Sequence, residues 1–312
     1  MIISASRRTD IPACYPDWMA RRVSEGFACV RNPMNPRQVS RVSLSPAVVD
    51  CIVFWSKNPA PMLEYLDLFR PWHFYFQYTL NAYGADVERR LPPLERRAET
   101  FLRLSDALGP ERVVWRYDPI LLSGDYPLEF HLEQFSRLAD RLRGAAERCS
   151  ISFLDEYAAI RTGLRQLGAR TPSDREKRSL AEGLAAAAGE DFRLVTCAEE
   201  IDLSEFGIGR GSCIDAQLIE RLAGCPLRTE PDKGQRSACG CAASIDIGAY
   251  DTCLNGCRYC YANYSKELVT QNMRQHDPQS PFLIGHSLPG DVIHQAQQES
   301  WVENQLSLFD LL

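Results

Sequence analysis

Short apolar runs alternate with amphipathic stretches along most of the chain, and no other feature restricts the fold as strongly. The runs are typical of buried strands, while residues 94–109, 128–145 and 175–189 have helical patterns, the first with Gly109 placed to end it. Strands separated by helices predict a parallel α/β fold, which we expect to close into a (β/α)8 barrel of the TIM type. A doubly wound open sheet is the alternative, because periodicity does not separate the two. The predicted strands cover residues 1–6, 27–31, 50–55, 73–80, 112–117, 149–154, 192–197 and 244–250.

The composition is that of a globular protein. Of the 312 residues, 45% are hydrophobic and 24% are charged, which suits one large domain or two small ones. No run of about 18 apolar residues occurs, and the first residues, MIISASRRTD, lack the basic and apolar regions of a signal peptide. We therefore expect a cytoplasmic protein with a barrel over residues 1–275 and a C-terminal extension over residues 276–312.

Charged and amide side chains follow nearly every predicted strand. Catalytic groups of a parallel barrel lie at the carboxyl ends of its strands, although polar turns such as Asn-Pro are also common without a function. Arg116 and Asp118 stand out, because a buried ion pair there is costly unless it holds a ligand or orders a site. With Asp10 and Lys57 they are our catalytic candidates. The strand ends are residues 7–10, 31–33, 56–59, 79–81, 116–119, 155–157 and 197–200.

Twelve cysteines are many for a protein inside the cell, where disulfides are rare. Eight of them lie between residues 197 and 260, and this crowding predicts metal or redox chemistry. The other four are scattered, and we interpret them as small buried hydrophobic residues. They are Cys14, Cys29, Cys51 and Cys149.

Cys253, Cys257 and Cys260 form a C-x3-C-x2-C motif between the last predicted strand and a helical stretch at residues 262–276. Strand, cysteine loop and helix in this order resemble the first βα unit of the radical S-adenosylmethionine (radical SAM) enzymes. The aromatic residue before the third cysteine, Tyr259, is part of the resemblance. Zinc is the competing interpretation, with Cys239 or Cys241 as a fourth thiolate.

The resemblance implies a [4Fe–4S] cluster held by three thiolates, with the fourth iron open as in a catalytic metal site. In the family, SAM binds that iron, and an electron from the cluster releases a 5′-deoxyadenosyl radical that abstracts hydrogen from a substrate. An electron donor such as flavodoxin or ferredoxin is then a further expected partner. The segment ASRRTD would stand where the family usually keeps a glycine-rich contact to the amine of SAM. No Gly-Gly-Glu-like tripeptide occurs in this chain, so the SAM-binding residues of the family are not carried over. Our candidates for cofactor binding are therefore taken from the strand ends and the motif, namely Arg7, Arg8, Asn58 and Tyr259.

The position of the motif departs from the family pattern. It follows the last predicted strand, whereas in a typical radical SAM chain it follows the first. A closed barrel accommodates this change, since its last strand lies beside its first and the chain break can move. We therefore expect a circularly permuted radical SAM barrel.

The chain is also similar over most of its length to a bacterial family called domain of unknown function 1848. That family brings no assigned substrate. The segments that carry the similarity are SASRRTDIP, FWSKNP, WRYDPI and CGCxxSIDIGAYDTCLNGCRYCYAN.

Four further cysteines come from loops on or near the expected active face. We interpret Cys197, Cys213, Cys239 and Cys241 as a candidate second iron–sulfur cluster. A structural zinc ion at the same four thiols, or separate core cysteines, are the alternatives.

The last residues carry a different signal. Gln305, Leu306, Leu308 and Phe309, in the segment QLSLF, resemble the peptide by which bacterial repair proteins dock on the DNA sliding clamp. Leucine and phenylalanine anchors on an exposed terminus suit a hydrophobic groove, although an apolar terminus can also pack on its own domain. Clamp docking would direct the chemistry to DNA repair, while the net charge of −6 is opposite to the basic surface that DNA binding usually needs.

Two classes of function remain from the sequence. The first is a radical SAM enzyme acting on an unknown substrate, such as a damaged nucleotide or DNA. The second is an iron–sulfur or zinc protein that transfers electrons or has a structural role without cleaving SAM. The polar strand ends favour the enzyme, because a metal carrier needs no ring of charged groups.

Overall fold

The computed structural model describes residues 1–236, 238–295 and 298–303, and of Ala159 only the backbone. The predicted docking peptide at residues 305–309 lies outside the described residues. Within the part of the chain that the structure describes, every helix falls short of the length and apolarity that a membrane crossing needs.

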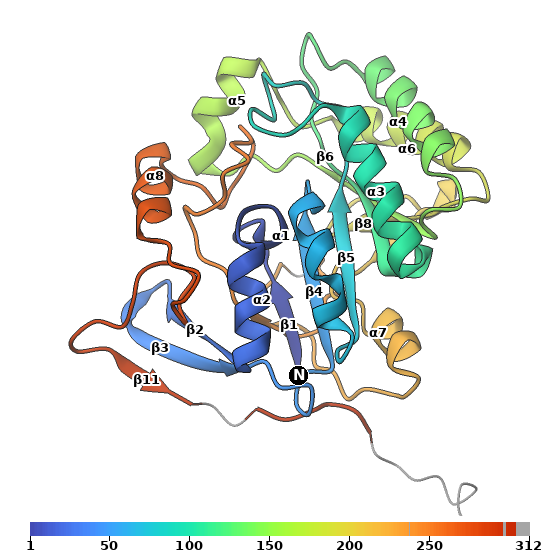
Figure 1. Cartoon of the computed structure of the whole chain (residues 1–312). Coiled ribbons are helices and arrows are strands. Elements are labelled where there is room, and N and C mark those ends of the chain that lie inside the picture. Colours follow the sequence, from blue (N-terminus) through green and yellow to red (C-terminus); the bar gives the residue numbers. More distant parts are fainter. Residues whose placement is uncertain (237, 296–297, 304–312) are drawn as a thin grey trace, which may run out of the picture.

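The large sheet contains eight parallel strands in the order β10-β1-β4-β5-β6-β7-β8-β9 (Figure 1). Its last strand in the sequence pairs with its first, with Ile245 opposite Ile3, as a permuted barrel requires. No pairing joins β9 to β10 within the described residues, so the sheet is parallel but open, and the predicted closure is not confirmed. The strands are β1 Ile2–Ala5, β4 Cys51–Ser56, β5 Phe74–Thr79, β6 Val113–Ile120, β7 Arg148–Phe153, β8 Arg193–Cys197, β9 Gly209–Gly211 and β10 Ile245–Asp246.

Residues 27–31 are not a strand of this sheet, so that part of the prediction is wrong. They lie in β2 (Phe27–Asn32), which pairs antiparallel with β3 (Asn35–Ser43), and β11 (Val292–His294) completes a separate small sheet. The connection from β2 to β3 is too short for the crossover of roughly a dozen residues that parallel strands need. β1 pairs directly with β4, and the eighth strand is β9, whose sequence Gly-Arg-Gly carries no apolar pattern and which lies at the sheet edge beside β8.

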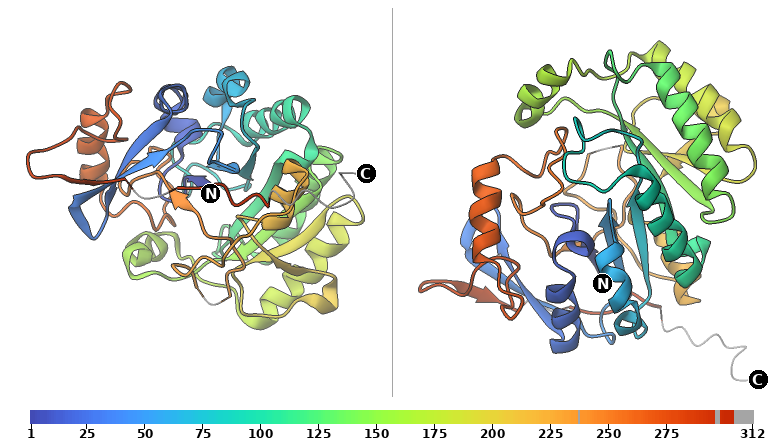
Figure 2. Two further views of the ribbon diagram at one scale, coloured as in Figure 1. Left: turned by 90° about the horizontal axis from the view of Figure 1, so that it is seen from below. Right: turned by 45° about the horizontal axis from the view of Figure 1, so that its top comes forward.

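The predicted helices are present, and Gly109 ends the first of them with a φ of 90°. Helices α3, α4 and α6 lie side by side along one face of the large sheet (Figures 1 and 2). The α-helices are α1 Ile11–Cys14, α2 Pro16–Glu25, α3 Leu94–Leu108, α4 Leu128–Leu142, α5 Arg161–Leu167, α6 Asp174–Ala188, α7 Ala216–Ala223 and α8 Lys266–Gln275. The 3-10 helices are Ala60–Phe69, Pro110–Arg112, Ala158–Ile160 and Ser204–Phe206.

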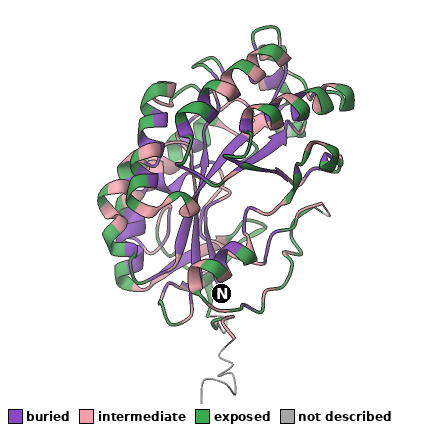
Figure 3. Cartoon of the chain, turned by 90° about the vertical axis from the view of Figure 1, so that its right-hand side faces the viewer, coloured by how far each residue is buried: buried purple, intermediate pink, exposed green. Residues whose placement is uncertain are grey.

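The helix-covered face of the sheet forms the main core. Successive residues of a strand point to opposite faces, and this face carries Phe54, Phe76 and Trp115. Trp115 stacks on Phe135 of α4 with the two ring centroids 4.7 Å apart. Buried strands between half-exposed helices are visible in Figure 3.

The opposite face of the sheet changes character along the strands. Toward the amino ends it is apolar, where Val53, Tyr75 and Val114 pack with α7 and Leu227 in a second core. Toward the carboxyl ends the same face carries Arg116, followed by Asp118, and both take part in polar contacts. The sheet therefore directs its polar side chains to one end.

Residues 276–303, predicted as an extension, return to the amino-terminal part of the chain. The indole N–H of Trp18 in α2 lies 3.0 Å from the carbonyl oxygens of both Ser280 and Phe282. The amino group of Met1 donates to the carbonyl of Glu299 at 2.8 Å.

Candidate functional site

The three motif cysteines lie in the loop between β10 and α8, and hydrogen bonds fix its ends. The carboxylate of Asp251 accepts from the backbone N–H of Ser265 at 3.0 Å. The side chain of Asn263 donates to the carbonyl of Cys253 at 2.7 Å. Gly256 has a φ of 67°, which favours glycine because it has no Cβ. These contacts define how the thiols are presented.

The motif loop packs against a second loop, which connects β5 to α3. The N–H of Arg90 donates to the carbonyl of Asn255 at 3.1 Å. Glu88 and Cys257 pair as an antiparallel bridge. The motif therefore lies next to Glu88, an acidic residue that does not follow the end of a predicted strand.

The three motif thiols lie within electrostatic reach of one another, and Lys57 lies near Cys257. Burial, and then the neighbouring Cys253, raise the pKa of Cys260 to about 11. The backbone N–H groups of Ala262 and Asn263 oppose this shift.

The described residues contain no group of three or more His, Cys, Asp or Glu side chains arranged to hold a metal ion. Ligands of one zinc ion must surround a single point. The thiolates of a [4Fe–4S] cluster each bind a different iron, so they need not converge in this way.

Cys14, predicted as a small buried hydrophobic residue, is half-buried and lies near the thiol of Cys253. The Cys14 thiol, followed by burial, raises the pKa of Cys253 well above its ordinary value. A fourth thiol therefore lies at the edge of the motif, at the end of α1. The other scattered cysteines, Cys29, Cys51 and Cys149, are buried as predicted.

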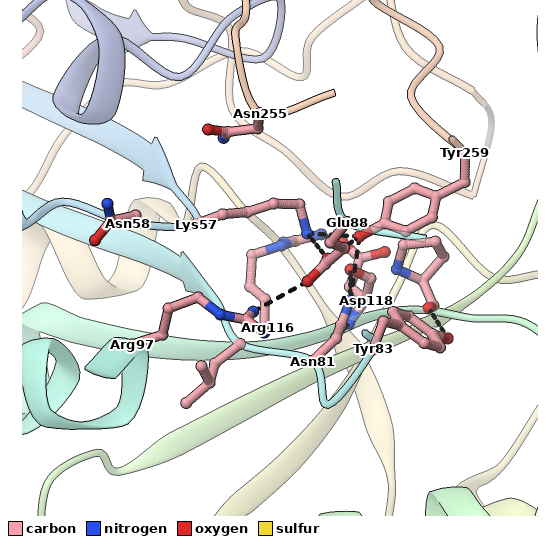
Figure 4. A network of polar contacts seen from close by, with 12 residues as sticks. Lys57, Asn58, Asn81, Tyr83, Glu88, Arg97, Arg116, Asp118, Asn255 and Tyr259 are labelled. Carbon is pink, nitrogen blue, oxygen red and sulfur yellow. Dashed lines mark hydrogen bonds and ion pairs between the residues drawn. The ribbon is translucent and has the colours of Figure 1, made fainter. Parts of the chain in front are cut away.

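A buried network of charges lies beside the motif (Figure 4). Lys57 Nζ lies 2.9 Å from Glu88 Oε1 and 2.7 Å from Tyr259 Oη. The second carboxylate oxygen of Glu88 accepts from Arg97 Nη1 at 3.0 Å. Burial disfavours the charged form of Lys57. The neighbouring Glu88 and, to a smaller extent, Cys257 outweigh this effect and raise the pKa of Lys57. Glu88 thus joins two of the predicted site residues, Lys57 and Tyr259.

Arg116 and Asp118 form an ion pair at the carboxyl end of β6, where the sequence placed them. Asn81 holds the Asp118 backbone, accepting from its N–H and donating to its carbonyl, each at 2.8 Å. Although burial disfavours the charged carboxylate, Arg116 holds the pKa of Asp118 below its ordinary value. Arg116 Nη1 also lies 2.7 Å from the sulfur of Cys213. The pair therefore reaches a second group of thiols.

Asp10 connects two strand-end loops. Its carboxylate accepts from the backbone N–H of Lys57 and from the side chain of Asn255, each at 2.8 Å. Burial raises the pKa of Asp10, and these donors oppose the shift. Asn58 differs from its neighbours, since its amide points away from the network in Figure 4.

The two predicted arginines after β1 lie in different surroundings. Arg7 Nη1 pairs with Asp232 at 3.0 Å, and its guanidinium lies over the ring of Trp55. Its Nη2 is buried and has no hydrogen-bond partner among the described residues. Arg8 Nε lies 3.9 Å from the carboxylate of Asp246 in β10. Arg7 and Arg8 therefore approach the sheet edge from β1.

Cys197, Cys213, Cys241 and Cys239 lie near one another, and we call them the second thiol group. The sulfurs of Cys197 and Cys213 lie 2.9 Å apart. Cys241 lies close enough to affect the pKa of both Cys213 and Cys239. The Cys241 thiol lowers the pKa of Cys239 to about 7. All four predicted thiols are thus brought together.

A hollow of about 530 Å³ opens beside the second thiol group. Two residues of its lining, Ala198 and Ala238, directly follow Cys197 and directly precede Cys239. Charged groups of both signs line the rest of it. They are Asp155, Asp174, Lys177, Glu199, Glu200 and Arg236.

Some predicted positions do not belong to this edge, and some residues of the edge were missed. Arg31 lies in the small sheet, where it pairs with Asp291 at 2.7 Å. Asp246 had a local signal, since an acidic residue inside an apolar strand is unusual. Glu88 and Arg97 had none, because their role depends on a loop that folds back on the motif.

Comparison with known proteins identifies the family. No curated protein and no solved structure matches the chain. A family model with the description Domain of unknown function (DUF1848) matches residues 2–262, which include every strand of the large sheet and all three motif cysteines. The chain therefore belongs to this family of proteins with a domain of unknown function.

Proposed function

We propose that the protein is a radical SAM enzyme whose barrel is circularly permuted. The observation that carries the proposal is the gathering of three half-buried motif thiols beside the charged carboxyl ends of the parallel strands. Pairing of β10 with β1 supports the permutation, because it places the motif strand next to the first strand of the chain.

Cys253, Cys257 and Cys260 would hold a [4Fe–4S] cluster. When bound, the cluster supplies the electron that cleaves SAM and the open iron at which SAM binds. Lys57 compensates part of the negative charge of the thiolates, since it lies near Cys257. Glu88 holds this lysine in place at 2.9 Å.

The residues between the two thiol groups would face the substrate. Arg116 and Asp118 lie there with their charges paired, and Asn81 fixes the backbone of Asp118. Such a pre-oriented polar edge orders a ligand without reorganisation during the reaction. Arg7, Arg8, Asn58 and Asp10 remain candidates for cofactor binding or positioning.

Anaerobic reconstitution tests the proposal. Protein loaded with iron and sulfide, then given dithionite and SAM, should release 5′-deoxyadenosine. A sample that carries the cluster but releases none, or that contains zinc and no iron after anaerobic purification, would instead support the alternative, an iron–sulfur or zinc protein without SAM cleavage.

We also propose that QLSLF docks on the DNA sliding clamp, which would direct the enzyme to DNA or nucleotide lesions. A purified bacterial clamp should bind the full chain with micromolar affinity, about 8 kcal/mol. Leu308→Ala with Phe309→Ala removes both anchors and should abolish binding without changing the iron content. Binding that survives this double change, measured by calorimetry, would contradict docking through these anchors.

A further inference from the structure

The second thiol group is built from chain segments that lie far apart in the sequence. Cys197 ends β8, Cys213 follows β9, and Cys239 and Cys241 precede β10. The sulfurs of Cys197 and Cys213 nevertheless lie 2.9 Å apart. The Cys241 sulfur accepts from the N–H of Ile214, the residue after Cys213, at 3.4 Å. Cysteines that only fill a core have no reason to gather, because any small apolar side chain would pack equally well.

The surroundings of these thiols are cationic. Arg116 donates to the sulfur of Cys213 at 2.7 Å. Arg7 lies within electrostatic reach of Cys241 and Cys213, and its buried Nη2 is without a partner among the described residues. The guanidinium of Arg236 likewise lies within electrostatic reach of Cys197. Each of these guanidinium groups also pairs with a carboxylate, that of Asp118, Asp232 or Asp155. Positive charge close to a thiol favours its charged form, so these groups favour thiolates.

The backbone gives an independent observation. Among the described residues, the two non-glycine residues with a left-handed backbone are Ala198 and Asp251, each with a φ of 54°. Ala198 directly follows Cys197, and Asp251 lies two residues before Cys253. Strained backbone of this kind persists where the surrounding structure requires it, often at functional sites. Both thiol groups thus share this feature.

We propose that Cys197, Cys213, Cys239 and Cys241 bind a second [4Fe–4S] cluster, separate from the one at the motif. Four thiolates are the usual ligand set of such a cluster. A zinc ion fits less well, since structural zinc sites space their paired cysteines by two to four residues, whereas only Gly240 separates Cys239 from Cys241.

Disulfides do not account for the group. The sulfurs of Cys197 and Cys213 are 2.9 Å apart, well beyond the bond length of about 2.0 Å. All four cysteines are free. A disulfide between Cys197 and Cys213 would also leave Cys239 and Cys241 without a role.

Metal content after removal of the motif cysteines tests this inference. The full chain with Cys253, Cys257 and Cys260 changed to alanine, reconstituted anaerobically with iron and sulfide, should retain about four irons and four sulfides. Adding Cys197→Ala and Cys213→Ala should reduce both to background. Cys225→Ala, which removes a cysteine of neither group, is the matched control and should retain the iron.

The outcome does not depend on the proposed function, because retained iron reports on the second thiol group alone. If the triple variant binds no iron, or if its iron survives the loss of Cys197 and Cys213, the proposal is overturned. One zinc per chain in place of iron would overturn the cluster. Since Cys213 is buried and its loss could unfold the chain, Cys239→Ser at a half-exposed site is the second variant. It should change the electron paramagnetic resonance signal of the retained cluster while circular dichroism stays unchanged.

Discussion

Changing Cys253, Cys257 and Cys260 to alanine should remove about four irons per chain and reduce formation of 5′-deoxyadenosine to background. The expected loss is complete, because a thiolate deleted from the cluster has no replacement and SAM has no other iron to bind. Iron and sulfide analysis together with chromatography of the nucleoside products measures both effects. Replacing any one of the three cysteines should also lower the iron content and the formation of 5′-deoxyadenosine.

Cys14 provides the sharpest control for this prediction, since its thiol lies near Cys253 without belonging to the motif. Cys14→Ala should retain the iron and the SAM cleavage if the fourth iron is open. If Cys14 were the fourth ligand, the cluster would be closed as in an electron carrier, and the variant would lose iron. Loss of iron in Cys14→Ala would therefore contradict the open site and favour the function without SAM cleavage.

Replacing Glu88 by glutamine should lower the free energy of unfolding by about 3–5 kcal/mol, the usual result of breaking a buried ion pair. The side chain of Glu88 is 1% exposed and compensates both Lys57 and Arg97. The lysine can lose its proton when the carboxylate is gone, but the arginine cannot. An uncompensated guanidinium then remains in the interior. Urea unfolding followed by circular dichroism, with each variant in the same state of metal loading, measures the difference.

Glu99→Gln is the matched control, because it removes an exposed carboxylate that lies 3.2 Å from Arg96 on the surface of α3. Exposed pairs contribute roughly 0–1 kcal/mol, so this variant should unfold nearly as the unchanged chain does. Adding Lys57→Met to Glu88→Gln should recover part of the lost stability, since one of the two unpaired cations is removed with it. Equal free energies of unfolding for the Glu88 and Glu99 variants would show that the buried charges around Glu88 contribute little to stability.

Local patterns in the sequence determined much of the large sheet and the cysteine motif. Seven strands of the large sheet coincide with predicted apolar runs, and α3, α4 and α6 follow the predicted helical patterns. These features depend on hydrophobic periodicity and capping, which act over a few residues. The spacing of Cys253, Cys257 and Cys260 is local in the same sense, and Arg116 and Asp118 lie two residues apart on one strand.

Tertiary structure alone decided which distant side chains meet. Residues 27–31 read as a strand of the large sheet, but the short turn after them leads to an antiparallel partner. Cys14 reaches Cys253, and Glu88 reaches Lys57 and Arg97, through loops whose path no local pattern predicts. Burial then selects these partners, because a charge removed from water is stable only beside an opposite one, wherever in the sequence that partner lies.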